Sequence, residues 1–261
     1  MRILMIGDVI GKPGRDAVRS IVPGLRKELN IDFVVANGEN TAGGFGLTVE
    51  TASELLDSGV DVLTSGNHIW DKKEIIPYLD DTQDSGVPIL RPANYPDAPG
   101  IGLIQWKGVT VINLMGRVFM AALDCPFRTA DRLLDGLIEN NEKTPIIIVD
   151  FHAEATSEKQ ALGWYLDGRV SAVFGTHTHV GTVDTRILPR GTAYLTDVGM
   201  TGPVDSVIGS DREAVLDRFL TAMPQRLAVA SGPCVLNSVL VDVDDASGIA
   251  TAVERVDRMA D

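Results

Sequence analysis

Five short apolar segments, each followed directly by polar residues, restrict the fold of this chain more than any other feature. They are rich in β-branched residues, which is typical of buried strands. The segments are Arg2–Gly7, Asp32–Ala36, Val60–Thr64, Pro145–Val149 and Ser171–Phe174. Helical patterns over Gly14–Leu29 and Thr48–Ser58, and a short one after Asp71, follow the first three segments. This alternation of strands with helices predicts a parallel sheet with crossover helices.

The second half of the chain contains more strands. Gly102–Trp106 and Val109–Leu114 flank Lys107-Gly108, which indicates a hairpin. Helices are expected near Thr129–Asn140 and Asp211–Ala222. The other strands expected after Thr192 are Ala193–Val198, Arg226–Ser231, Cys234–Val241 and Ala250–Val256. A parallel half and a strand-rich half predict an α/β fold with two packed sheets and helices outside. With no linker or internal repeat, one domain over residues 1–261 is the simplest organisation.

The charge balance excludes several classes of partner. The chain of 261 residues has 36 acidic and 23 basic residues, a net charge of −13. Proteins that bind long nucleic acids regardless of sequence, or anionic membrane surfaces, need clustered Lys and Arg. No segment approaches the roughly 18 apolar residues of a membrane span, and no signal-peptide pattern follows Met1. We therefore expect a cytoplasmic protein with a small substrate.

The polar clusters at the ends of the five expected strands predict a binding site. Ligands of open α/β sheets bind outside the carboxyl ends of the strands, and parallel strands place these ends at one edge. The clusters are Gly7-Asp8, Asn37-Gly38-Glu39-Asn40, Ser65-Gly66-Asn67-His68, Asp150-Phe151-His152-Ala153-Glu154 and Gly175-Thr176-His177-Thr178-His179.

The histidines indicate what this site binds. A single histidine is more often structural than functional, but all four histidines of the chain lie in these clusters. Imidazole, carboxylate and amide oxygen are ligands of divalent first-row metals. In extended conformation, His177 and His179 would point their rings to the same side. About seven ligands are too many for one tetrahedral ion and suit two metals, with Glu39 able to bridge them.

The ordered set GD, GEN, GNH, FHAE and GTHTH resembles the calcineurin-like metallophosphoesterase superfamily. The chain departs from the usual D-x-H motif, because Ile10 stands where the histidine would be, and Glu39 replaces the usual bridging aspartate. Together with the opening GDVIGKPGR and the stretch NGENTAGGFGLT, these departures resemble the YmdB-type branch of bacterial phosphodiesterases.

The resemblance implies a four-layer αββα sandwich and a phosphodiesterase acting on cyclic nucleotides, 2′,3′-cyclic ones among them. Asp8, Glu39, Asn40 and His179 would bind the first metal, and Glu39, Asn67, His152 and His177 the second. His68 would be the general acid that protonates the leaving oxygen. The cations would activate a shared water and neutralise the phosphate. Because the first site is rich in oxygen ligands, iron or manganese is favoured over zinc.

Several alternatives stay open at the level of sequence. The same site could serve a phosphomonoesterase or a nucleotide pyrophosphatase, or a regulator that binds metal or nucleotide without turnover; His68 argues against the regulator. Lys12, Arg15 and Arg117 could contact phosphate or be solvated surface charges. The loop Thr41–Leu47 could be a mobile rim or a turn. Asp150 and Glu154 could orient His152 or be structural. A homo-oligomer is possible.

Overall fold

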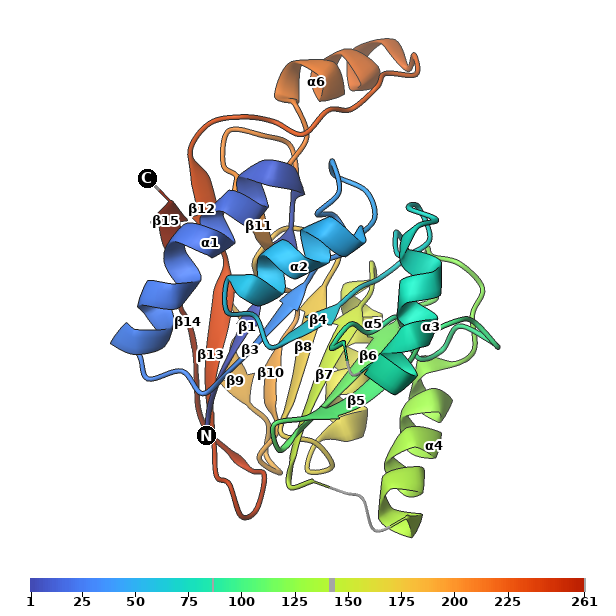
Figure 1. The fold of residues 1–261 in the computed structure, drawn as a ribbon, viewed down its shortest axis with the longest axis vertical. Coiled ribbons are helices and arrows are strands. Elements are labelled where there is room, and N and C mark those ends of the chain that lie inside the picture. Colours follow the sequence, from blue (N-terminus) through green and yellow to red (C-terminus); the bar gives the residue numbers. More distant parts are fainter. Residues whose placement is uncertain (86, 141–143, 261) are drawn as a thin grey trace.

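The computed structural model describes residues 1–85, 87–140 and 144–260 (Figure 1). One mixed sheet contains the N-terminal strands. Its strand order is β14 (Ala250–Arg255), β13 (Ser238–Val243), β1 (Arg2–Ile6), β3 (Phe33–Asn37) and β4 (Val62–Thr64). β1, β3 and β4 are parallel, whereas β13 is antiparallel to both β1 and β14. The carboxyl ends of β1, β3 and β4 therefore lie at the same edge.

A second mixed sheet contains the strands from the middle of the chain. Its order is β5 (Leu103–Trp106), β6 (Val109–Met115), β7 (Ile146–His152), β8 (Ala172–Thr176), β10 (Ala193–Leu195) and β9 (Arg186–Ile187). β6, β7, β8 and β10 are parallel, and the edge strands β5 and β9 are antiparallel to their neighbours. Lys107 and Gly108 join β5 to β6 with φ angles of 49° and 82°, the sign that a type I′ hairpin turn requires.

A small third sheet joins the two ends of the chain. Its order is β15 (Arg258–Ala260), β12 (Cys234–Leu236), β11 (Met200–Pro203) and β2 (Asp8–Val9). β2 is parallel to β11 and follows β1 after Gly7 alone. A Cβ atom at Gly7 would lie 2.0 Å from the carbonyl oxygen of Gly199, so only glycine fits where the chain passes between these sheets.

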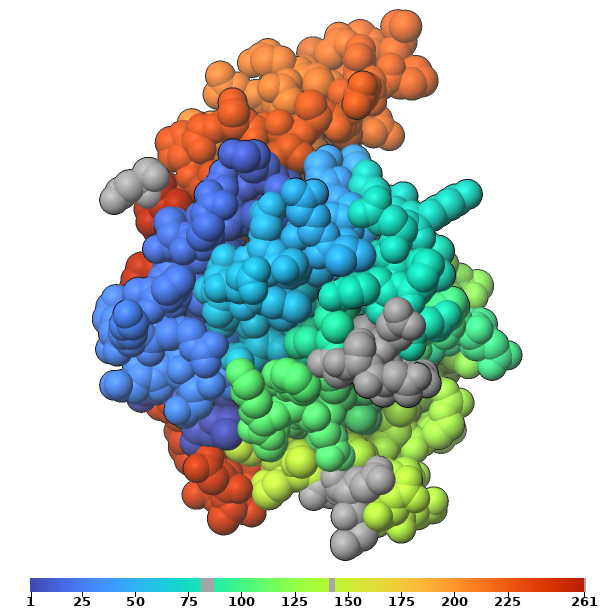
Figure 2. Space-filling model, in the orientation of Figure 1, coloured from blue at the N-terminus to red at the C-terminus, as the bar shows by residue number. Residues whose placement is uncertain are grey.

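The helices cover the outer faces of the two larger sheets. The described helices are α1 (Gly11–Glu28), α2 (Val49–Asp57), α3 (Ile75–Ser85), α4 (Pro126–Glu139), α5 (Thr156–Leu166) and α6 (Arg212–Thr221). α1, α2 and α3 pack on the sheet of β1, and α4 and α5 pack on the sheet of β7. α6 instead extends from one end of the molecule, as Figures 1 and 2 show.

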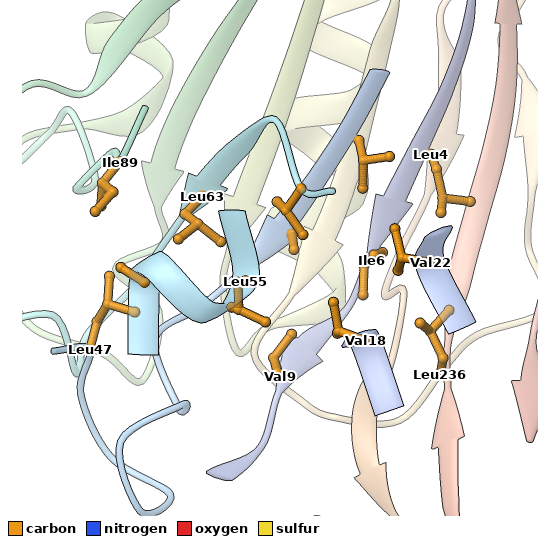
Figure 3. Close-up of a cluster of buried hydrophobic side chains, with 14 of the residues drawn as sticks. Leu4, Ile6, Val9, Val18, Val22, Leu47, Leu55, Leu63, Ile89 and Leu236 are labelled. Carbon is orange, nitrogen blue, oxygen red and sulfur yellow. The ribbon is translucent and has the colours of Figure 1, made fainter. Parts of the chain in front are cut away.

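The two faces of β1 show why the strands are apolar on both sides. Ile3 and Met5 lie in a buried cluster with Val111 and Ile148 of the second sheet. Leu4 and Ile6 point to the other side, into a cluster with helix α1 (Figure 3). Successive side chains of a strand alternate between faces, so a strand between another sheet and a helix needs an unbroken apolar run.

The prediction of a mixed α/β fold with packed sheets is confirmed. Within it, α1 and α4 begin three residues before the expected positions, and the short helix expected after Asp71 begins at Ile75. The segment expected as the strand Cys234–Val241 forms two strands, β12 and β13, in different sheets.

Other details of the prediction are wrong. Arg226–Ser231 is not a strand and makes only one isolated bridge within the described structure, at Val229. The small third sheet was not expected. Helix α5 was missed because Glu158 and Lys159 are buried on it, which removes the usual contrast between an apolar and a charged face. No helix in the described ranges combines the length and the apolar character that crossing a bilayer would require.

Lys159 forms a buried ion pair that supports the second sheet. Its Nζ lies 2.6 Å from Asp197 Oδ2, and both side chains are 1% exposed. Asp197 also accepts hydrogen bonds from the backbone N–H groups of Thr178 and Gly199. The pair therefore links α5 to the loop that carries His177 and His179.

We expect Lys159→Met to lower the free energy of unfolding by about 3–5 kcal/mol, because it leaves Asp197 as an uncompensated buried charge. Lys107→Met is the matched control, because Lys107 is 60% exposed and its partner Asp61 keeps an ion pair with Arg26. The control should lose no more than about 1 kcal/mol. Urea denaturation of both variants measures the difference, and equal losses would contradict this account.

Candidate metal centre

The predicted site residues come together, but at the ends of strands from two sheets. Glu39, Asn40 and Asn67 follow β3 and β4, whereas His152 ends β7 and His177 follows β8. The expectation that one sheet edge carries all five clusters is therefore wrong. The two larger sheets pack against each other through their buried side chains, so their carboxyl ends can share a site.

His152 is the centre of one group of side chains. It is completely buried, and three possible ligand atoms surround its Nε2 atom. These are Glu39 Oε1 at 3.0 Å, Asn67 Oδ1 at 3.1 Å and His177 Nδ1 at 3.0 Å. The ligand atoms of Glu39, His152 and His177 all lie within 4.8 Å of one another, close enough to hold a metal ion.

A second group lies beside the first and shares Glu39. Asn40 Nδ2 lies 3.3 Å from Glu39 Oε1 and 3.2 Å from His179 Nε2. His179 Nε2 is also 3.9 Å from Asp8 Oδ1. Asp8, Glu39 and Asn40 are almost fully buried. Glu39 is thus positioned between the two groups of predicted ligands.

The charges of this site depend strongly on one another. Burial alone would raise the pKa of Glu39, but the charge and hydrogen bond of His152 lower it to about 2. Burial alone would lower the pKa of His152, but Glu39 raises it to about 9. Burial raises the pKa of Asp8 to about 6, and burial beside His152 lowers that of His177 to about 3. A proton on His152 therefore compensates the carboxylates.

The donor atoms present fit divalent cations. Asp8 Oδ1 is buried and has no hydrogen-bond partner among the described residues, which is unfavourable for a carboxylate oxygen. His152 Nε2 can donate one proton, yet three possible acceptors lie within 3.1 Å of it. A cation accepts lone pairs from all of these atoms at once, and metal binding commonly displaces such a proton.

The backbone at the two neighbouring histidines differs from the extended conformation that we expected. His177 has φ 99° and His179 has φ 64°, both in a region that residues other than glycine seldom adopt. The backbone N–H of His177 donates to Asp8 Oδ2 at 3.0 Å, which helps to hold this geometry. The rings do not point to one side as in a strand: His177 contacts His152, and His179 contacts Asn40.

His68 lies at the edge of this group and makes different contacts. Its Nδ1 is 2.9 Å from Asp71 Oδ2, and its backbone N–H donates to Glu39 Oε2. The ring of Phe45 meets the His68 ring edge-on, with the ring centres 4.9 Å apart. Asp71 was not expected at the site, although its position three residues after His68 permits this contact.

Asp150 and Glu154, the two carboxylates beside His152 in the sequence, make different contacts. Asp150 reaches the ring indirectly, because Thr176 Oγ1 donates to Asp150 Oδ1 at 2.7 Å and lies 3.0 Å from His152 Nδ1. Glu154 contacts His177 rather than His152, with Glu154 Oε2 3.0 Å from His177 Nε2. Such outer contacts orient metal-binding rings in other proteins.

The glycine-rich loop, residues 41–47, is a turn held by hydrogen bonds. The Ala42 N–H donates to the Gly46 carbonyl oxygen, and the Gly44 N–H donates to that of Asn40. Arg15 donates to the carbonyl oxygen of Thr41 and pairs with Glu54, while Lys12 pairs with Asp16 on the surface. Arg15 therefore stabilises this loop.

A cavity of about 410 Å³ opens over the predicted ligands. Side chains of Glu39, Asn40, His177 and His179 line it, together with His68. Its remaining lining includes Arg218 of α6, which the sequence analysis missed because nothing in the local sequence of α6 links it to the histidine clusters.

Two comparisons by sequence find proteins similar to this chain. The profile of a family described as "YmdB-like protein" matches residues 4–256. The chain is 52% identical over 261 residues to a Bacillus subtilis (strain 168) protein named 2′,3′-cyclic-nucleotide 2′-phosphodiesterase, and the match covers 98% of this chain and 96% of that protein.

Two crystal structures are also similar. One is a hypothetical protein from Thermus thermophilus, with a TM-score of 0.89, 44% identity and 99% of both chains covered. The other, described as a novel phosphatase from Mycoplasma pneumoniae, has a TM-score of 0.90 and 32% identity, and the match covers 99% of this chain and 93% of that chain.

We expect Gly66→Ala to weaken Mn²⁺ binding by roughly 10- to 100-fold, as when groups that support metal ligands are disturbed. A Cβ atom at Gly66 would lie 2.2 Å from His152 Cδ2 and 2.5 Å from Glu39 Oε2. Gly24→Ala is the control, since its added Cβ meets nothing within 4 Å. Calorimetric titration compares the variants. Wild-type affinity in Gly66→Ala would show that these side chains do not bind the metal.

Proposed function

Because the chain belongs to the YmdB-like family, we propose that it is a metal-dependent phosphodiesterase that hydrolyses 2′,3′-cyclic nucleotides. The observation that carries the proposal is the convergence of Asp8, Glu39, His152 and His177, of which Glu39 and His177 line one cavity. A buried oxygen of Asp8 has no hydrogen-bond partner among the described residues. The name of the Bacillus subtilis relative supports the choice of substrate. A cavity of about 410 Å³ suits a small nucleotide.

The proposal includes two divalent metal ions. Asp8, Glu39, Asn40 and His179 would hold the first, and Glu39, Asn67, His152 and His177 the second. The oxygen-rich ligands of the first site favour iron or manganese over zinc. When bound, such a pair of ions activates water and neutralises phosphoryl oxygens.

His68 has the role of proton donor in this proposal. Its Nδ1–H donates to Asp71, which fixes the ring, and Nε2 carries the proton that is transferred. A water oxygen forms a bond to phosphorus and loses one proton to solvent. The bond between phosphorus and the ribose 2′ oxygen breaks, and this oxygen takes the proton from His68, which regains one from solvent. The result is a nucleoside 3′-phosphate. Glu39 Oε2 accepts a hydrogen bond from the backbone N–H of His68. This contact places the proposed proton donor beside the proposed metal ligands.

The same proposal treats the chain as one metallophosphoesterase domain with a four-layer αββα arrangement. Three clusters of buried side chains support it, one between the two larger sheets and one below the helices on each outer side. A phosphomonoesterase is a second candidate, since the similar Mycoplasma pneumoniae structure is described as a phosphatase. Hydrolysis rates on 2′,3′-cyclic nucleotides and on nucleoside 3′-phosphates distinguish the two.

Glu39→Gln should lose both metals, because it removes the carboxylate that the two sites share. Asn40→Ala should weaken the first site alone, and Asn67→Ala the second alone. These two variants are the internal controls. Elemental analysis after dialysis against limiting Mn²⁺ measures the number of metal ions per chain. One tightly held metal per chain in active wild-type protein would overturn the two-metal assignment.

His68→Ala should keep its metal content while kcat for a cyclic nucleotide falls roughly 10²–10⁴-fold, the usual contribution of general acid catalysis. The loss should be much smaller for bis-p-nitrophenyl phosphate, because nitrophenolate leaves without needing a proton. Asp71→Asn should lie between wild type and His68→Ala. Equal losses on both substrates, or a loss of metal, would argue against this role of His68.

A further inference from the structure

The cavity extends beyond the predicted metal ligands to an outer wall without an assigned role. We define this outer wall as Phe45, Ile208, Arg218, Leu227 and Val229. Phe45 lies in the glycine-rich loop after β3, and the others lie in or beside α6, far along the chain. The two parts meet where the Val229 side chain packs against Gly44, with 3.0 Å between Val229 Cγ2 and a Cβ atom built on Gly44. The wall is mostly apolar, with one cation.

The Phe45 side chain is partly exposed to solvent at the cavity and does not pack into the core. Its side chain is 44% exposed, although an aromatic ring is among the most favourable groups to bury. Gly43, Gly44 and Gly46 all have positive φ, so the loop has a conformation that holds the ring at the cavity. One edge contact, with His68, positions the ring beside the proposed proton donor.

Arg218 places an exposed cationic side chain at the same wall. Its guanidinium has no ion pair or hydrogen bond with any residue in the described ranges, whereas Arg212 on the same helix pairs with Glu213. A guanidinium offers five donors and no acceptor. A group that hydrogen-bonds to Arg218 in a complex is therefore an acceptor.

We propose that the outer wall is a nucleobase subsite, in which the base of the substrate stacks on Phe45 and its acceptor edge meets Arg218. The inference rests on the proposed function, because it follows from the chemistry of a cyclic nucleotide. If His68 protonates the ribose 2′ oxygen, the neighbouring 1′ carbon carries the base only two bonds from the 2′ carbon. Phe45 is the aromatic ring in contact with His68, so the base lies next to it.

Arg218 gives this subsite a preference among bases. Guanine presents two acceptors, O6 and N7, on one edge, and a guanidinium binds both at once. Adenine has an amino donor in place of O6, which faces the donors of Arg218 unfavourably. Guanine nucleotides should therefore be better substrates than adenine nucleotides.

The test compares three substrates at saturating Mn²⁺: 2′,3′-cyclic GMP, 2′,3′-cyclic AMP and glycerol 1,2-cyclic phosphate, which has no base. Phe45→Ala should raise KM for both nucleotides roughly 5- to 150-fold, the range of one base–aromatic stack, and Phe45→Trp should restore it. KM for the glycerol compound should stay within about twofold, since that compound has no base to lose a stack. Arg218→Gln should reduce the preference for guanine over adenine about fivefold or more.

Matched controls come from the same helix. Phe219 is 81% exposed and Arg212 is exposed and paired, and neither is among the described residues that line the cavity. Phe219→Ala and Arg212→Gln should behave as wild type. The subsite is overturned if Phe45→Ala and Arg218→Gln leave both nucleotides unchanged. It is also overturned if they impair glycerol cyclic phosphate equally, which would place both residues at the phosphate.

Failure of the proposed function gives a different result. Wild-type protein would then hydrolyse none of the three cyclic phosphates, with or without Mn²⁺. Calorimetric binding of 2′,3′-cyclic GMP still tests the subsite in that case, because binding that weakens in Phe45→Ala and not in Phe219→Ala supports it. Equal binding by wild type and Phe45→Ala overturns it.

Discussion

Two carboxylates that are buried side by side are the constraint on which the rest of this structure depends. Removing a charge from water is costly unless a partner compensates it. His152 compensates Glu39, with 3.0 Å between Nε2 and Oε1, but Asp8 Oδ1 has no hydrogen-bond partner among the described residues. The surrounding chain keeps this arrangement in place: Asp150 acts on His152 through Thr176, and the His177 backbone binds the other oxygen of Asp8. Such a site gains stability when a cation binds.

The fold holds these groups together through two sheets rather than one. Unbroken apolar runs such as Ile146–Val149 of β7 are buried on both faces of the sheet. This burial fixes the position of the carboxyl end of the strand relative to its neighbours. His152 is the last residue of β7, so packing of the strand positions it without help from a loop. His179 depends on a left-handed backbone and on the hydrogen-bond distance of 2.9 Å between its Nδ1 and the carbonyl oxygen of Ile208. Strands thus place Asp8 and His152, and the segments that follow strands supply the other proposed ligands.

The sequence was sufficient to predict which side chains come together at the candidate site, but not their geometry. Residue types at strand ends identified Glu39, His152 and His177 as neighbours, because apolar runs end where parallel strands meet a ligand. Local patterns could not show that β12 and β13 belong to different sheets, since both are apolar and Asn237 alone separates them. Arg218 could not be found either, because its approach to the cavity depends on how the chain after β11 returns to the glycine-rich loop.

The proposed catalytic residues and the proposed base-binding residues lie on parts of the chain that contribute differently to the stability of the fold. Four of the proposed metal ligands, Asp8, Glu39, Asn40 and His152, are buried. Glu39 contacts His152, Asn40 and the backbone of His68, so a change at Glu39 affects all three. Arg218 lies on α6, where Val215 is the buried residue among the described positions, and α6 extends from the body of the molecule (Figure 2). A change on this helix costs little core packing. In the proposed subsite, the preference for a base can therefore change through α6 while the buried carboxylates Asp8 and Glu39 stay as they are.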